Sequence, residues 1–188
     1  MSSPRRVCVF CGSKMGASPV YAAAARQFGA LLATRGLGLV YGGGNIGLMG
    51  VLADAALNGG GQVIGVIPNM LKDKELAHAG LTELHIVETM HARKALMAEK
   101  SHAFVALPGG YGTADELFEI LTWRQLHLHD KPIGLLNVAG FFDPFLAWVE
   151  AMVGAGFVTP RNRRLIQVSD DPAALLDMIA SWRQQPRD

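Results

Sequence analysis

A glycine-rich segment near the middle of the chain has the residue types of a phosphate-binding turn. It reads Pro-Gly-Gly-Tyr-Gly-Thr-Ala-Asp-Glu over residues 108–116, after the apolar run 103–107 and before the largely apolar run 117–121. This order predicts a strand, a glycine turn and the start of a helix. Glycines let a backbone approach an anion closely, and the N–H groups and dipole of a helix N-terminus favour negative charge. Asp115 and Glu116 add carboxylates one turn into that helix, which indicates chemistry on a bound nucleotide as well as binding.

The same segment also allows a purely structural interpretation. Thr113 and Glu116 have the spacing of a capping box, in which each side chain bonds the other residue's backbone N–H. On local grounds this interpretation is favoured. It would leave Glu116 partly engaged, but still at the edge of the sheet where a ligand is expected.

The end of the first expected strand offers a second set of polar groups. Gly12 and Ser13 follow this strand, and the Ser13 hydroxyl suits either a phosphate contact or an ordinary loop. Cys8 and Cys11 form a literal C-x-x-C just before it. Residues 6–11 nevertheless read as a buried strand, on which residues three apart point to opposite faces. Disulfide exchange and metal binding are therefore disfavoured.

A second glycine turn follows the next expected strand, within residues 41–50. It contains a literal G-x-G-x-x-G at Gly42, Gly44 and Gly47, which raises a dinucleotide-binding dehydrogenase as an alternative. Such a site expects an acidic residue about 20 positions later, but residues 62–68 supply none. A Walker A phosphate loop is also missing, because no glycine-lysine-Ser/Thr triplet occurs in the sequence.

A basic pair opens another expected helix, at residues 90–97. Arg93 and Lys94 lie near its N-terminus, where the helix dipole opposes positive charge, so both call for an anionic partner. That partner is either a bound phosphate or carboxylate, or a neighbouring acid such as Glu88 or Glu99. The spacing alone leaves both alternatives open.

These segments require a fold that brings strand ends together. Short β-rich runs alternate with helical stretches, a pattern typical of βαβ units and a parallel sheet covered on both faces. We expect strands near residues 7–11, 37–41, 63–67, 84–87, 103–107, 133–136 and 166–168. We expect helices near residues 19–34, 48–57, 91–100, 113–126, 144–155 and 172–182. The prediction is one α/β, doubly wound domain over residues 1–188, with about seven parallel strands and the ligand at their carboxyl ends.

Composition narrows the class of ligand. Half of the residues are hydrophobic, 18% are charged and the net charge is about +1, which disfavours a nucleic-acid surface or a membrane patch. The uncharged stretch 36–53 includes seven glycines, so it is a poor membrane helix. No secretory signal is visible, and we expect a cytoplasmic protein with a small-molecule ligand.

Together, segments 10–13, 41–50, 90–94 and 108–116 resemble the Lonely Guy family of cytokinin riboside 5'-monophosphate phosphoribohydrolases. The pair P-G-G-x-G-T-x-x-E and M-x-x-R-K carries the resemblance, and the order of segments matches over nearly the whole chain. The resemblance implies a Rossmann-like homodimer. Its activity would be hydrolysis of the N-glycosidic bond of N6-substituted adenosine 5'-monophosphates, with AMP as a further candidate substrate. No metal, organic cofactor, nucleic acid or membrane is implied.

The resemblance also implies roles for individual residues, with Arg93 and Glu116 as the catalytic pair. The nucleotide contacts that it implies are Glu75, Arg93, Lys94, residues 109–116 and Thr122. With the strand ends and glycine turns described above, the predicted substrate-binding residues are Gly12, Ser13, Gly43, Gly44, Glu75, Met90, Arg93, Lys94, Pro108, Gly109, Gly110, Tyr111, Gly112, Thr113, Asp115, Glu116 and Thr122. Lys14 departs from the family, whose members usually carry a second serine in that loop.

Two alternative functions accompany the resemblance. Relatives have been labelled lysine decarboxylases, but Lys94 beside Arg93 is a poor candidate for a lysine that holds pyridoxal phosphate. A non-catalytic carrier of a nucleotide or of molybdenum cofactor shares the fold, and fold analogy cannot decide between carrier and enzyme. The presence of both Arg93 and Glu116 favours the enzyme.

Overall fold

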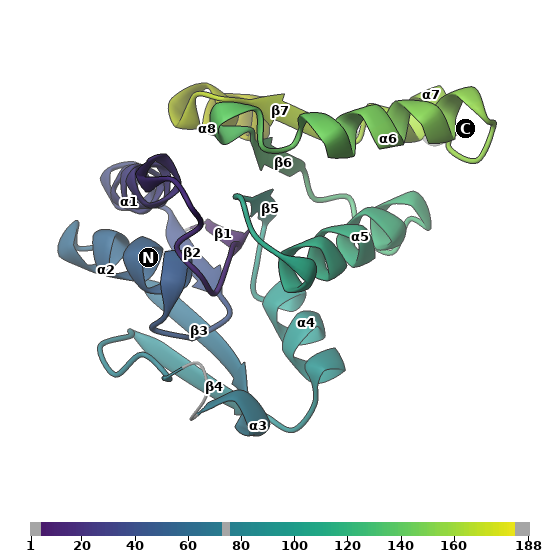
Figure 1. Ribbon diagram of the computed structural model, residues 1–188. Coiled ribbons are helices and arrows are strands. Elements are labelled where there is room, and N and C mark those ends of the chain that lie inside the picture. The colour runs from purple at the N-terminus through teal and green to yellow at the C-terminus, as the bar shows by residue number, and fades with distance from the viewer. Residues whose placement is uncertain (1–4, 73–75, 183–188) are drawn as a thin grey trace.

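The computed structural model describes residues 5–72 and 76–182, and these residues build a single parallel sheet flanked by helices (Figure 1). The sheet has seven strands in the order β4-β3-β2-β1-β5-β6-β7. The strands are β1 Arg6–Phe10, β2 Gly38–Tyr41, β3 Val63–Pro68, β4 Glu83–Val87, β5 Ala103–Ala106, β6 Ile133–Leu136 and β7 Ile166–Ser169. Every pairing is parallel, so the predicted α/β, doubly wound fold class is confirmed.

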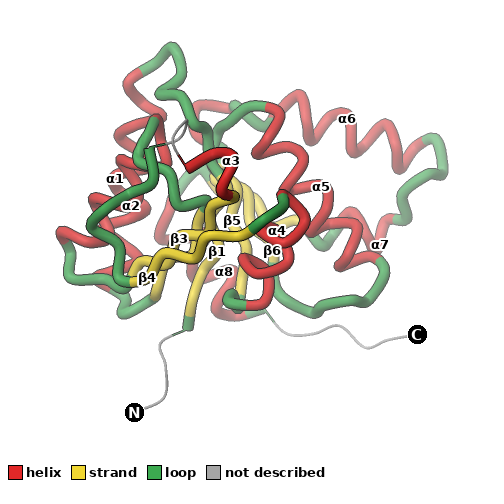
Figure 2. Tube along the Cα trace, turned by 90° about the horizontal axis from the view of Figure 1, so that it is seen from below, coloured by secondary structure: helices red, strands yellow, loops and turns green. Residues whose placement is uncertain are grey.

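Helices cover both faces of the sheet, as Figures 1 and 2 show. The helices are α1 Pro19–Thr34, α2 Gly47–Asn58, α3 Asn69–Lys72, α4 Met90–Glu99, α5 Tyr111–Gln125, α6 Asp143–Gly154, α7 Pro160–Arg163 and α8 Pro172–Ser181, with a 3₁₀ turn at Val138–Gly140. One core cluster joins the sheet to α1, α2 and α8, and the other joins it to α4, α5 and α6. The short α3, α7 and 3₁₀ turn were not predicted, because a helical turn of three or four residues is too short to show hydrophobic periodicity.

The opening strand confirms the interpretation of the cysteine pair. Cys8 is buried in one core cluster and Cys11 in the other, so the two thiols lie on opposite faces of the sheet. Both are free cysteines. A side-chain period of two residues along a strand accounts for this separation.

The order in which the chain adds strands to the sheet reverses between β1 and β5. From β1 the chain continues outward through β2, β3 and β4, and then returns to place β5 on the other side of β1. In sheets of this kind ligands bind at such a switch point, outside the carboxyl ends of the strands. At this edge a backbone hydrogen bond joins the ends of β5 and β1, because Leu107 N donates to Phe10 O at 2.9 Å.

The uncharged stretch at residues 36–53 is divided between β2, a glycine turn and α2. Over residues 5–72 and 76–182, every helix is too short or too polar to cross a lipid bilayer.

We predict that Gly29 is required for the packing of α1 on α2. A Cβ atom there would collide with Leu52 O and lie 3.1 Å from Ala55 Cβ and 3.2 Å from Ala56 N. Because backbone cannot move aside cheaply, Gly29→Ala should lower the free energy of unfolding by about 1–3 kcal/mol. Urea denaturation followed by circular dichroism would measure it.

The matched control is Gly154→Ala at the end of α6, where a Cβ atom meets nothing within 4 Å. There the same substitution should raise the free energy of unfolding by about 0.5 kcal/mol, because alanine loses less backbone entropy in a helix. Equal effects at the two sites would contradict the packing argument.

Candidate active site

Three strand ends meet at the carboxyl edge of the sheet and are joined by backbone hydrogen bonds. Gly12 N donates to Pro108 O at 3.1 Å, and Leu48 N donates to Gly12 O at 3.0 Å. The segments that follow β1, β2 and β5 therefore lie against one another, as the sequence predicted.

This close approach requires glycine at two positions. Gly47 has a φ of +58°, and a Cβ atom there would overlap the backbone of Ser13 and Lys14. A Cβ atom on Gly109 would collide with the Thr113 hydroxyl and lie 2.9 Å from Gly12 N. Any larger residue at either position would push the turns apart.

A cavity of about 450 Å³ opens between these turns, within the range of small-molecule sites, roughly 300–1,000 Å³. The predicted site residues that line it are Gly12, Ser13, Arg93, Pro108, Gly109, Gly110, Tyr111, Gly112, Thr113 and Glu116. The lining also includes residues that the sequence did not single out as ligand contacts, namely Cys11, Lys14, Gly16, Tyr21, Leu48, Met49 and Phe141.

The start of α5 differs from the predicted capping box. The helix begins at Tyr111 with Gly110 as its N-cap and no side-chain cap bond, so Thr113 is already the third helical residue. The capping-box interpretation was wrong, because extended backbone at Gly110 lets the helix start earlier than Thr113. The first intrahelical bond runs from Ala114 N to Gly110 O, which leaves the N–H groups of residues 111–113 at the cavity without intrahelical acceptors.

Arg93 is a buried cation held against two backbone carbonyls. Its side chain comes from α4, its Nε donates to Val66 O at 3.1 Å, and its Nη2 donates to Gly42 O at 2.7 Å. Met90 lies beside it, with the sulfur 4.0 Å from Arg93 Nη1, but does not line the cavity. These bonds fix the plane of the guanidinium group in the cavity wall.

Lys94, the neighbour of Arg93, has acidic partners within the protein. Its Nζ lies 3.0 Å from Asp115 Oδ2 and 3.1 Å from Glu119 Oε1. Burial would lower the pKa of Lys94, but the hydrogen bonds to these carboxylates raise it overall. The ion pairs join α4 to α5 away from the cavity, and neither Lys94 nor Asp115 lines it.

The other predicted contacts lie outside the cavity wall. Gly43 accepts a hydrogen bond from His78 N at 3.0 Å, and Gly44 forms an isolated bridge with Ala77. Thr122 donates to a carbonyl of its own helix, Phe118 O, at 2.7 Å. Glu75 lies outside the described residues.

Glu116 lines the cavity close to Cys11. Burial raises the pKa of the Cys11 thiol, and the negative charge of Glu116 raises it further. The same two causes, in the same order, raise the pKa of Cys8. Both thiols therefore stay protonated at neutral pH, which disfavours redox chemistry. In the part of the chain that the structure describes, no three His, Cys, Asp or Glu residues are grouped to hold a metal ion.

The aromatic wall of the cavity comes from distant parts of the sequence. Tyr21 of α1 and Phe141, next to the 3₁₀ turn, make an edge-to-face contact with ring centroids 5.8 Å apart. Lys14 directly follows the segment 10–13, and Leu48 and Met49 lie within the segment 41–50, so the motifs indicated the neighbourhood of these three residues. No motif indicated Tyr21 and Phe141, because only the tertiary fold brings them together.

Comparison with protein families gives a match to the model described as "Possible lysine decarboxylase", over residues 49–179. A rice protein (Oryza sativa subsp. japonica) named "Probable cytokinin riboside 5'-monophosphate phosphoribohydrolase" is 50% identical over 184 residues, which cover 98% of this chain and 75% of that protein. A cytokinin riboside 5'-monophosphate phosphoribohydrolase of Arabidopsis thaliana is 50% identical over 178 residues, covering 95% and 84% of the two chains.

Solved structures share the fold at lower identity. The molybdenum cofactor carrier protein of Chlamydomonas reinhardtii has a TM-score of 0.73 and 22% identity, covering 95% of this chain and 99% of that one. The molybdenum cofactor binding protein of Rippkaea orientalis has a TM-score of 0.71 and 22% identity, with 96% and 98% covered. This likeness shows the fold alone.

We predict that the native protein resists thiol alkylation. Because Cys8 and Cys11 are buried and the pKa of each is raised, iodoacetamide at pH 8 should label both at least about a hundredfold more slowly than in unfolded protein. Intact-mass spectrometry over time would measure labelling, with urea-denatured protein as the reference. Rapid labelling of native Cys11, or an intramolecular disulfide, would restore the redox interpretation.

Proposed function

The chain belongs to the Lonely Guy family of cytokinin riboside 5'-monophosphate phosphoribohydrolases, and from that premise we propose that it hydrolyses N6-substituted adenosine 5'-monophosphates. The bond broken is the N-glycosidic bond, and the products are the free base and ribose 5-phosphate. One observation carries the proposal: Arg93 and Glu116 both line a single cavity that also contains the glycine turn before α5.

The substrate phosphate is assigned to that turn. Gly109 and Gly110 admit an anion close to the backbone, and the N–H groups of residues 111–113 lie at the positive end of the helix dipole. Binding energy from the phosphate would orient the reacting bond, so a nucleoside without phosphate should be a poor substrate.

Glu116 is assigned to the reacting bond. As the base departs, positive charge develops on the ribose, as in other glycoside hydrolyses. A carboxylate beside the sugar stabilises this charge and takes a proton from the attacking water. Electrostatic stabilisation of this kind is worth about 3 kcal/mol, or roughly a hundredfold in rate.

Arg93 is assigned to orienting the nucleotide and Glu116. Two of its nitrogens are held by Val66 O and Gly42 O, so the group has little rotational freedom left in the cavity wall. A fixed guanidinium forms charge-assisted hydrogen bonds with anionic groups and lowers the entropic cost of reaching the reactive geometry.

Lysine decarboxylation, the activity in the family description, fits these residues poorly. A lysine that forms a Schiff base must lose its proton, and such lysines have a lowered pKa. The pKa of Lys94 is raised by its bonds to Asp115 and Glu119, and its side chain lies outside the cavity.

A non-catalytic carrier is the second candidate, because the two molybdenum cofactor proteins share this fold. Their identity to this chain is low, and the relatives at about half identity are named as hydrolases. Released base separates the two functions, since a carrier would bind its ligand without turnover.

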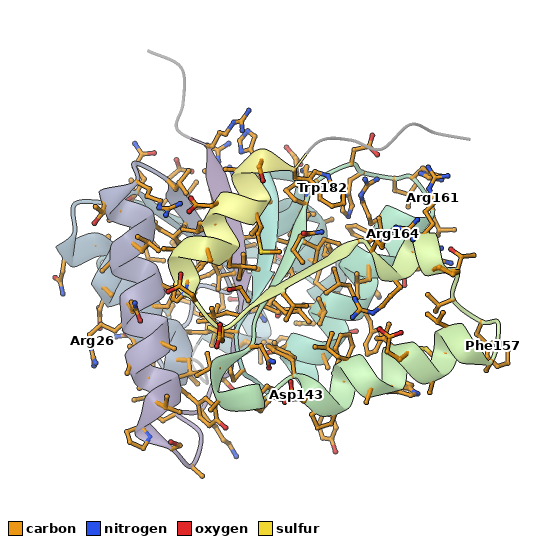
Figure 3. All side chains as sticks on the ribbon, turned by 90° about the horizontal axis from the view of Figure 1, so that it is seen from above. Arg26, Asp143, Phe157, Arg161, Arg164 and Trp182 are labelled. Carbon is orange, nitrogen blue, oxygen red and sulfur yellow. The ribbon has the colours of Figure 1, made fainter. Side chains whose placement is uncertain are left out.

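The same proposal includes a homodimer in the cytoplasm, with AMP as a further substrate. Large apolar side chains support self-association: Trp148 and Phe157, at or near α6, are 56% and 81% exposed, and Leu128 is 68% exposed (Figure 3 labels Phe157). Sedimentation at several protein concentrations would test the dimer.

The central experiment is hydrolysis of AMP and of N6-isopentenyladenosine 5'-monophosphate, with free base measured by chromatography. Glu116→Gln removes the charge and keeps the shape, so turnover should fall roughly a hundredfold or more. Glu150→Gln is the matched control, because Glu150 pairs with Arg163 on the surface outside the cavity. It should retain the wild-type rate.

Three outcomes of this experiment bear on different parts of the proposal. Equal rates for wild type and Glu116→Gln would remove Glu116 from catalysis. Comparable turnover of N6-isopentenyladenosine, the nucleoside without phosphate, in a parallel assay would remove the phosphate site. Binding of nucleotide without release of base would favour the carrier.

We predict that Gly42→Ala impairs catalysis through Arg93. A Cβ atom at Gly42 would run into Arg93 Nη2 and lie 3.2 Å from Met49 Sδ, so the guanidinium must move. A shift of this kind should lower kcat/KM by about tenfold or more, while Gly154→Ala should leave it unchanged. A folded Gly42→Ala variant with wild-type kinetics would show that the position of Arg93 is unimportant.

A further inference from the structure

A second cavity, of about 290 Å³, lies at the amino ends of the strands, opposite the candidate active site. Arg6 of β1, Ala103 of β5 and Pro132 before β6 line it, and the end of α8 closes it at Ile179 and Trp182. Figure 3 labels Trp182 at the end of α8, and Figure 2 shows β1 beginning on the same side of the molecule. The volume is near the lower end of the range for small-molecule sites, roughly 300 Å³.

Positively charged and polar side chains gather at this cavity. Arg5, Arg6, Lys131 and His102 all line it. Among the described residues, no carboxylate lies within ion-pair distance of Arg5, Arg6 or Lys131. The pKa of His102 is lowered by burial and then by the charges of Arg6, Lys131 and Arg5, so positive charge outweighs negative charge at this ring, although Glu83 acts on Arg6 and Glu99 on Lys131 from beyond ion-pair distance.

Hydrogen bonds hold these side chains at the cavity without using all of their donors. Arg6 Nε donates to Lys100 O at 2.6 Å, and Lys131 Nζ donates to Ala98 O at 2.7 Å. His102 Nδ1 accepts from Arg6 N at 3.1 Å, which leaves Nε2 as the protonated nitrogen of the neutral ring. The terminal nitrogens of Arg6 have no hydrogen-bond partner among the described residues, so they can bind an anion bidentately.

The rest of the wall is apolar and contains one unsatisfied donor. Leu37, Leu176 and Ile179 contribute aliphatic surface. The indole Nε1 of Trp182 is buried and has no hydrogen-bond acceptor within the described part of the chain. A buried donor without an acceptor is costly, so the wall beside Trp182 is incompletely satisfied in the absence of a ligand.

We propose that this cavity binds a small organic anion with a flat apolar body, the class to which aromatic carboxylates belong. The carboxylate lies against Arg5, Arg6 and Lys131, and the ring lies against Leu176, Ile179 and Trp182. The site is separate from the proposed hydrolase cavity, because no residue lines both.

The test uses 2-naphthoate as the probe and the indole N–H signals of Trp123, Trp148 and Trp182 in ¹H–¹⁵N NMR spectra as the readout. Trp182→Phe serves only to assign the Trp182 signal. We expect 2-naphthoate to shift that signal to saturation while the other two signals stay in place. The neutral isostere 2-naphthylmethanol should bind about tenfold more weakly, since it lacks the charge.

Matched variants separate the cavity from general charge effects. The side chain of Arg5 makes no hydrogen bond or ion pair with other described residues and Arg26 lies on α1 outside the cavity (Figure 3), so neither substitution should disturb folding. Arg5→Gln should weaken 2-naphthoate binding about threefold, the effect of one exposed ion pair, and Arg26→Gln should not.

Several results would overturn the proposal. These are an unchanged Trp182 signal, equal affinity for acid and alcohol, or equal affinity in Arg5→Gln and wild type. Competition between 2-naphthoate and AMP in the hydrolysis assay would place the probe in the other cavity and would also count against it. If no hydrolysis is detected, the NMR titration still decides the question, because it does not depend on turnover.

Discussion

The buried charge of Arg93 is the constraint on which the candidate active site depends. A guanidinium taken out of water needs hydrogen-bond acceptors, and here Val66 O in β3 and Gly42 O after β2 supply them. Helix α4 must therefore pack where these carbonyls can be reached. Residue 42 must also lack a side chain, since a Cβ atom would clash with Arg93 Nη2. Glycine is thus required at position 42 because of where the Arg93 side chain lies, although the two residues are far apart in sequence.

The glycine turns serve two purposes that sequence alone does not separate. Some glycines, such as Gly47 and Gly109, are needed because two backbones touch where the strand ends meet. Others, such as Gly110 and Gly112, line the cavity, and a Cβ atom at either would meet no atom within 4 Å, so their lack of a side chain leaves room for a ligand. In the literal G-x-G-x-x-G, Gly47 belongs to the first kind and Gly42 leaves room for the guanidinium of Arg93, so the pattern has structural causes that need no acidic residue.

Local pattern was enough to predict the sheet, because buried parallel strands leave short β-rich runs bounded by turn residues. It failed where two local signals compete and where the decisive contact is tertiary. The start of α5 was misplaced because Thr113 and Glu116 satisfy a local rule, whereas Gly110 caps the helix. The acidic partners of Lys94 were missed because Asp115 and Glu119 belong to a different helix. Tyr21 and Phe141 reach the cavity from segments with no catalytic motif.

The ion pair between Lys94 and Asp115 explains how the two proposed catalytic residues reach one cavity. Consecutive helical residues project about 100° apart, because a turn takes 3.6 residues. Lys94 and Asp115 face each other between α4 and α5, while their neighbours Arg93 and Glu116 line the cavity. The ion pair between Lys94 and Asp115 therefore sets the position of Arg93 relative to Glu116. On this account Lys94 matters to the reaction through the spacing of the two helices, and not as a nucleophile.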